Sequence, residues 1–96
     1  MTNAHRGEVS LFIDGKAHTL CLTLGALAEI ETALGVSGFA DMADRLKRLS
    51  ASDLVAVLAA LLRGGGESVL ARDLASAKLD FAETARAVAD AFERAL

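Results

Sequence analysis

His18 and Cys21 are the two closely spaced residues whose side chains could bind a metal or support nucleophilic catalysis. Both fall in a segment with the alternating pattern of a strand, where residues three apart point to opposite faces. They therefore cannot bind one metal ion together, and a structural zinc site would need further ligands. The same geometry denies Cys21 the neighbouring base that a thiol nucleophile requires. We interpret Cys21 as a small, half-buried hydrophobic residue, and we expect no enzyme, no metal and no cofactor.

Two glycine-containing segments invite comparison with phosphate-binding loops. The segment "DGK" (14–16) lacks the upstream glycine and the following Ser or Thr of such a loop. The segment "GGG" (64–66) follows a predicted helix, whereas a phosphate site lies at the start of one. We interpret the first as a hairpin turn and the second as a helix stop.

Arg45, Lys47, Arg48 and Arg63 form the basic cluster of the chain. Aspartates alternate with these cations, at spacings of four that suit Asp41–Arg45 and Asp44–Arg48 pairs on a solvated face. The net charge is −3, while nucleic-acid-binding domains usually carry a basic excess. We therefore expect no nucleic-acid partner and rank a small DNA-binding regulator last among the possible functions.

The composition predicts a compact, mainly helical chain. Ninety-six residues suffice for a single domain with one modest core. Apolar residues make up 53% of the chain, mostly alanine and leucine, and proline is absent. We expect one domain over 1–96, with a flexible leader (1–7), a hairpin (8–23) and a helical part (24–96). The single cysteine, and the lack of a signal peptide or membrane-spanning run, predict a cytoplasmic protein that does not enter a membrane.

A β-hairpin is predicted on either side of the DGK turn, because apolar and polar residues alternate before and after it. If Asp14 and Gly15 were the central turn residues, Leu11 would face His18. If Gly15 and Lys16 were central, Leu11 would face Leu20 and the apolar face would be continuous. The second register is the one we predict, with a type II′ turn.

From residue 24 onward the apolar spacing changes to that of helices. Thr23 and Gly35 are the predicted cap and stop of the first helix, and Ser52 or Ser50 is the predicted cap of the third. Asp80 with Glu83 resembles a capping box at the start of the last helix. The predicted apolar stripes are Leu24, Leu27, Ile30 and Leu34 in the first helix; Phe39, Met42, Leu46 and Leu49 in the second; Leu70 and Leu74 in a fourth (68–78); and Phe81, Ala85, Val88, Phe92 and Leu96 in the last, where Arg86, Asp90 and Arg94 form an outer charge ladder.

The third helix (53–63) is apolar on almost every side, so it must be central or covered by a partner. The expected fold is therefore mainly α (α+β): an N-terminal β-hairpin followed by four to five short helices around one core.

The segment "HRGEVSLFIDGKAHTLCLTLGALAEIETALGV" (5–36) resembles the start of the small proteins encoded in the tail clusters of gene transfer agents and related tailed phages. The likeness lies in a Gly-Glu-Val strand (7–9), the Asp-Gly-Lys turn (14–16) and the junction at 22–31. The segment "SASDLVAVLAALLRGGG" (50–66) is similar to the family's next landmark, a capped apolar helix that ends at glycine. From residue 67 the likeness rests on helical pattern alone.

The resemblance implies a tail assembly chaperone that binds the tape-measure protein and recruits tail-tube subunits, the major tail protein. The same family is also labelled a tail-tube component, which would be a structural role. For a chaperone, the expected partner-binding residues are Phe12, Thr19 and Cys21 on the outer hairpin face, with Leu58 and Leu62 on the third helix. The alternative for Phe12 is burial under the last helix. The hairpin edges also suit a homo-oligomer, because they carry unpaired backbone groups.

Overall fold

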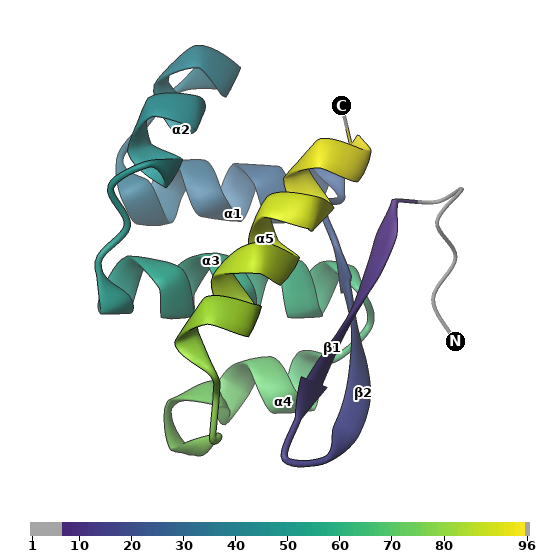
Figure 1. The fold of residues 1–96 in the computed structure, drawn as a ribbon. Helices are drawn as coiled ribbons and strands as arrows, with labels where there is room; N and C mark the ends of the chain where they lie inside the picture. The colour runs from purple at the N-terminus through teal and green to yellow at the C-terminus, as the bar shows by residue number, and fades with distance from the viewer. Residues whose placement is uncertain (1–6, 96) are drawn as a thin grey trace.

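The computed structural model describes residues 7–95 and shows an N-terminal hairpin followed by five helices (Figure 1). This arrangement confirms the predicted α+β class. The proposed leader, apart from Gly7, and Leu96 lie outside the described residues, and the side chain of Phe39 is also not described. The radius of gyration is 12.0 Å, close to the roughly 12.5 Å expected for a globular chain of this length.

The hairpin pairs β1 (Glu8–Ile13) with β2 (Lys16–Cys21) in an antiparallel sheet. The predicted register is wrong: Leu11 pairs with His18, and Ile13 pairs with Lys16. Asp14 (φ 53°) and Gly15 (φ 82°) are the two turn residues, both in the left-handed region that a type I′ turn requires. The preference of Asp-Gly for this turn outweighs the more continuous apolar pairing of the other register.

Helix α1 (Leu24–Leu34) begins and ends where the sequence predicts. The Thr23 hydroxyl accepts a hydrogen bond from the Ala26 N–H (3.1 Å), and Gly35 ends the helix with φ 69°. The predicted stripe is wrong at its first position, because Leu24 is 84% exposed. Ala26 takes the core position instead, one turn before Ile30.

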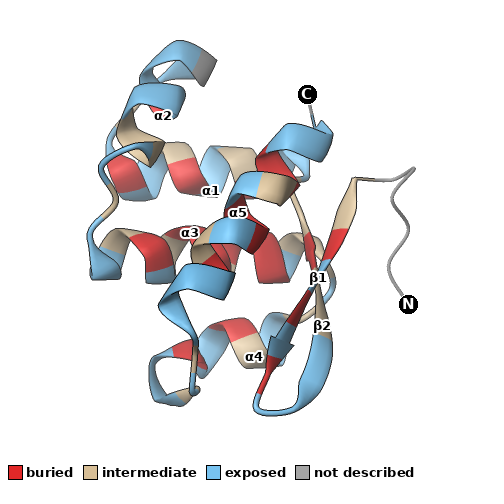
Figure 2. Cartoon of the chain, viewed as in Figure 1, coloured by how far each residue is buried: buried red, intermediate tan, exposed pale blue. Residues whose placement is uncertain are grey.

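Helix α3 (Ala51–Gly64) lies at the centre of the molecule. Ser50 caps it by a reciprocal pair of hydrogen bonds with Asp53, 3.1 and 3.2 Å long, so Ser50 and not Ser52 is the cap. The helix packs against α1, α4, α5 and β2, and red bands of buried residues run along it (Figure 2). Its all-round apolar character thus reflects a central position. Helix α2 (Gly38–Leu46) precedes it and contacts α1.

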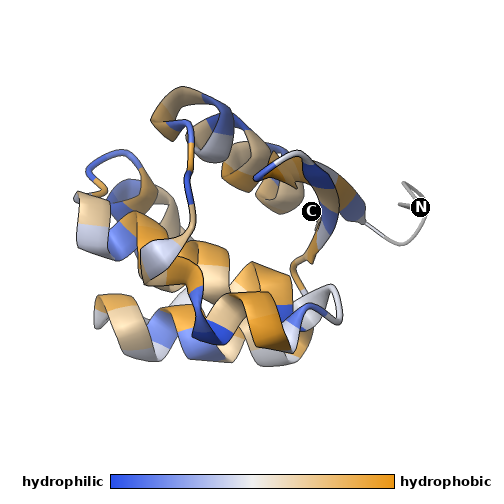
Figure 3. Ribbon diagram, turned by 90° about the horizontal axis from the view of Figure 1, so that it is seen from below, coloured by the Kyte–Doolittle hydropathy of each residue, from blue (hydrophilic) through white to orange (hydrophobic). Residues whose placement is uncertain are grey.

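The C-terminal part differs from the prediction in two respects. The predicted fourth helix is two short pieces, α4 (Ser68–Arg72) and the 3-10 turn η2 (Leu74–Ser76). Helix α5 (Phe81–Ala95) crosses in front of α3 in Figure 1, and the Asp80 carboxylate accepts from the Glu83 N–H (3.0 Å) at its start. Its predicted stripe is wrong at Phe81, which is 60% exposed. Hydrophobic and hydrophilic segments alternate along the helices (Figure 3); the buried residues of α5 are Thr84, Ala87, Val88, Ala91 and Phe92.

Candidate partner-binding surfaces

The outer face of the hairpin carries the three residues predicted to bind a partner there. Phe12 is 67% exposed, so helix α5 does not cover it. Thr19 and Cys21 are half-buried. Burial, together with the negative charge of Glu8, raises the pKa of the Cys21 thiol, which disfavours a reactive thiolate. Phe12 is therefore the main apolar contact that this face offers.

The outer edge of β2 is closed by the end of α3. A Cβ placed on Gly64 would lie 2.1 Å from the Cys21 carbonyl oxygen, and one on Gly65 would lie 2.1 Å from the Thr19 carbonyl oxygen. Neither glycine has a positive φ; Gly66 does, at 85°. The first two glycines are thus required for close approach of helix and strand, and Gly66 for the change of chain direction.

Glu67, just after these glycines, completes the closure. Its carboxylate accepts a hydrogen bond from the Thr19 N–H (2.9 Å) and lies 3.2 Å from Nδ1 of His18. The bond from the Thr19 N–H, followed by the contact with His18, lowers the pKa of the Glu67 carboxyl. Glu67 is not among the site residues predicted from the sequence. Its only sequence signal is a lone carboxylate directly after a glycine run.

The outer edge of β1 is arranged differently. Thr19 pairs with Ser10, and the Thr19 N–H points away from β1. In an antiparallel pair of this kind both residues direct their N–H and C=O groups outward, so those of Ser10 point away from β2. The same holds for Phe12, because the pattern repeats every second residue. Within residues 7–95, neither Ser10 nor Phe12 makes a hydrogen bond beyond the hairpin. These groups face a groove of about 290 Å³ between β1 and α5, whose lining includes Glu83, Arg86 and Asp90. We call this the β1 groove.

A second hollow surface lies on both sides of Phe81. It consists of two adjoining hollows of about 230 and 120 Å³, and both are lined by Phe81 and Leu54. We call it the Phe81 groove; its other apolar lining residues are Leu46, Leu49, Ala51, Val55, Leu58, Leu79, Ala85, Val88 and Ala89. Sequence reasoning missed it because Phe81 fits the helical spacing of a core stripe.

Leu58 and Leu62, the two predicted contacts on α3, are fully buried. Leu58 forms part of the floor of the Phe81 groove, and Leu62 belongs to the core. Neither side chain is exposed in the isolated chain, so a partner would meet Phe81 and Val55 first.

Thr84 lies at the base of the same groove and is 1% exposed. Its hydroxyl has no hydrogen-bond partner in the structure. An unsatisfied buried hydroxyl costs about 1–3 kcal/mol. Local costs of this kind concentrate at functional surfaces, where stability of the chain alone is not the only requirement.

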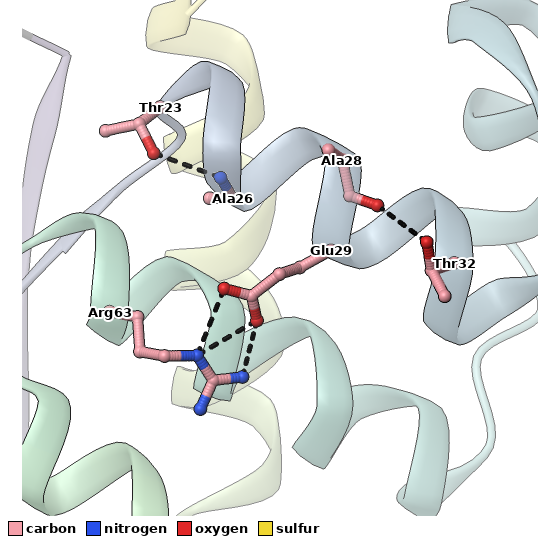
Figure 4. Close-up of polar contacts among 6 residues, drawn as sticks. All are labelled: Thr23, Ala26, Ala28, Glu29, Thr32 and Arg63. Atoms are coloured by element: carbon pink, nitrogen blue, oxygen red, sulfur yellow. Dashed lines mark hydrogen bonds and ion pairs between the residues drawn. The ribbon is translucent and has the colours of Figure 1, made fainter.

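Half of the predicted basic cluster is paired with carboxylates. Arg63 donates to Glu29 on α1 through both Nε and Nη2, at 2.6–3.1 Å (Figure 4). Arg45 contacts Asp53 at 2.6 Å instead of the predicted Asp41. The bond from the Ser50 N–H, and then Arg45, lower the pKa of Asp53. Two of the four cations are thus paired with carboxylates, which weakens the case for a phosphate-binding face.

In the part of the chain that the structure describes, no helix is long and apolar enough to cross a membrane. The same residues contain no group of three or more His, Cys, Asp or Glu side chains that could hold a metal ion.

Comparison with known families matches residues 6–96 to the family described as "Phage tail tube protein, GTA-gp10", whose short name carries the abbreviation TAC. The chain belongs to this family. The match extends over the C-terminal half, where the resemblance rested on helical pattern alone. No curated protein and no solved structure matches the chain. This GTA-gp10 family member therefore takes its identity as a phage tail protein from the family and its candidate surfaces from the structure.

Proposed function

We propose that this GTA-gp10 family member is a tail assembly chaperone, which binds an amphipathic helical segment of the tape-measure protein and brings tail-tube subunits to it. The observation that carries the proposal is the Phe81 groove. A groove of this kind, apolar and lined by Leu, Val and Phe, suits the apolar stripe of a helix. The abbreviation TAC in the family's short name, read as tail assembly chaperone, agrees with this role.

Charge around the Phe81 groove defines the partner further. Lys47 is the one charged residue among those that line the groove. Within residues 7–95, its side chain takes part in no ion pair. A helix that carries an acidic residue beside its apolar stripe would complement it. We therefore expect the bound tape-measure segment to be acidic along its flanks.

A structural role in the tail tube is the alternative, and the description of the family favours it. Tube subunits form rings through extensive β-structure. The described chain has one two-stranded sheet, and the outer edge of β2 is already closed by Gly64, Gly65 and Glu67. These features support the chaperone role over the tube role.

The test is co-expression with a tape-measure fragment, followed by mass-resolved size exclusion. Phe81→Glu should abolish the complex, because it puts a charge in the middle of the groove. Leu24→Glu is the matched control, because Leu24 is also an exposed apolar residue at the first position of its helix and lies outside the groove. A complex that survives Phe81→Glu, or a wild-type chain that ignores the fragment, would contradict the proposal. Recovery of the chain at ring stoichiometry in mature particles would establish the tube role instead.

A further inference from the structure

The two outer edges of the hairpin differ in their contacts with the rest of the chain. At β2, two glycines and a carboxylate occupy the edge, and the Thr19 N–H is satisfied. At β1, the outward groups of Ser10 and Phe12 face the β1 groove. An open strand edge of this kind is a template for pairing with another strand.

We propose that β1 is the interface through which two copies of this chain associate, by antiparallel pairing of β1 with β1 of the second copy. A two-fold axis makes such an edge self-complementary, since each strand offers the same outward N–H and C=O groups to the other. Pairing Ser10 with Phe12 of the second copy lets both residues exchange hydrogen bonds. It also joins the two hairpins into one four-stranded sheet, with the exposed Phe12 rings on one face.

The charges of the β1 groove identify a second copy as the occupant. Going along α5, Glu83, Arg86 and Asp90 alternate in sign. In the described chain none of them is in an ion pair, including the Arg86–Asp90 pair of the predicted ladder. A groove for a basic or an acidic peptide would present one sign of charge. An alternating row instead complements its own copy, because Arg86 of each chain can meet an acidic residue of the other.

The first test compares two proline variants by sedimentation equilibrium over a range of concentrations. Ser10→Pro removes an outward N–H from β1 without removing a bond of the hairpin ladder. Ala17→Pro is the matched control, because Ala17 pairs with Phe12 and its outward N–H lies on the β2 edge. We expect a wild-type dimer that Ser10→Pro weakens by about tenfold to hundredfold, since two bonds are lost per dimer. Ala17→Pro should leave the dimer constant within about threefold.

A charge swap keeps the test informative if proline disturbs the fold. Arg86→Glu alone, and Glu83→Arg combined with Asp90→Arg, should each weaken self-association, because each gives a row of one sign. An equimolar mixture of the two variants should form a heterodimer, in which opposite signs meet again. A wild-type chain that stays monomeric at all concentrations, or a dimer that neither Ser10→Pro nor either charge variant weakens, would overturn the proposal. These measurements need no tape-measure fragment, so their failure is separate from failure of the chaperone role.

Discussion

The two outer edges of one small hairpin differ in this protein: one is closed by other elements and one is open. The edge of β2 is closed by direct contact with α3 and by a part-buried hydrogen bond from the Thr19 N–H to the Glu67 carboxylate. The outer edge of β1 instead faces an open groove. An isolated two-stranded hairpin is marginally stable in water. Contacts of β2 with α3 and of β1 with α5 anchor the hairpin to the helices, while the outward backbone groups of Ser10 and Phe12 make no hydrogen bond beyond the hairpin within residues 7–95.

The largest expected effect comes from breaking the closed edge at its glycines. Gly65→Ala should destabilise the chain by about 3 kcal/mol, because the new methyl group would meet the Thr19 carbonyl oxygen and backbone cannot move aside cheaply. Gly66→Ala is the control from the same triplet. It has no atom within 4 Å of the added Cβ and should cost only about 1 kcal/mol, from its positive φ. Urea unfolding measures both; equal losses would refute close approach as the reason for Gly65.

A smaller loss is expected when the carboxylate at this edge is removed. Glu67→Ala leaves the Thr19 N–H without its acceptor and should cost about 1–3 kcal/mol. Glu67→Gln keeps an acceptor oxygen and should recover part of that loss. Urea unfolding at pH 7 measures both variants against wild type, and an unchanged stability in Glu67→Ala would show that water replaces the carboxylate at no cost.

The lowered pKa of Glu67 predicts how the free energy of unfolding changes at acid pH. The pKa of Glu67 is lower in the folded chain than its ordinary value of 4.5, so its contribution is fully present above pH 4.5. It is lost as the pH falls through the folded-state pKa, since the unfolded chain then binds the proton more readily. In Glu67→Gln the stability should therefore fall less steeply between pH 4.5 and lower pH than in wild type. Parallel slopes would contradict the assigned bond.

The smallest effect on stability is expected at the open edge. Phe12→Ser should change the unfolding free energy of the monomer by no more than about 0.5 kcal/mol, because Phe12 is mostly exposed. It should nevertheless weaken self-association, since it removes an apolar side chain from the paired face. Unfolding and sedimentation of the same sample separate the two quantities. A stability loss as large as that of Gly65→Ala would mean that Phe12 belongs to the core.

Local signals account for the parts of the fold that the sequence predicts correctly. Thr23, Gly35 and Ser50 act through hydrogen bonds or backbone angles within a few residues of themselves; Thr23 and Gly35 occupy their predicted roles, and Ser50 is one of the two predicted caps of its helix. The hairpin register is also local, but apolar continuity predicts it wrongly because the preference of Asp14-Gly15 for a type I′ turn is the stronger signal.

The features that the sequence does not predict depend on contacts between distant elements. Gly64 and Gly65 have the composition of a helix stop, and only their position against β2 shows why a side chain is forbidden there. Leu24 and Phe81 follow helical spacing, but both stand at the first position of a helix, where the stripe has not yet reached the core. Consequently the Phe81 groove could not be found from periodicity.

Amide hydrogen exchange by NMR, on dilute and concentrated samples, tests the asymmetry of the two edges most directly. In dilute solution the Thr19 N–H should be protected from exchange by its hydrogen bond to Glu67. The N–H groups of Ser10 and Phe12 should exchange quickly, whereas the N–H of Leu11, which is bonded to β2, should be protected. Concentrating the sample should protect Ser10 and Phe12 and leave Thr19 unchanged. Equal protection of Ser10 and Thr19 in the dilute monomer would contradict the account.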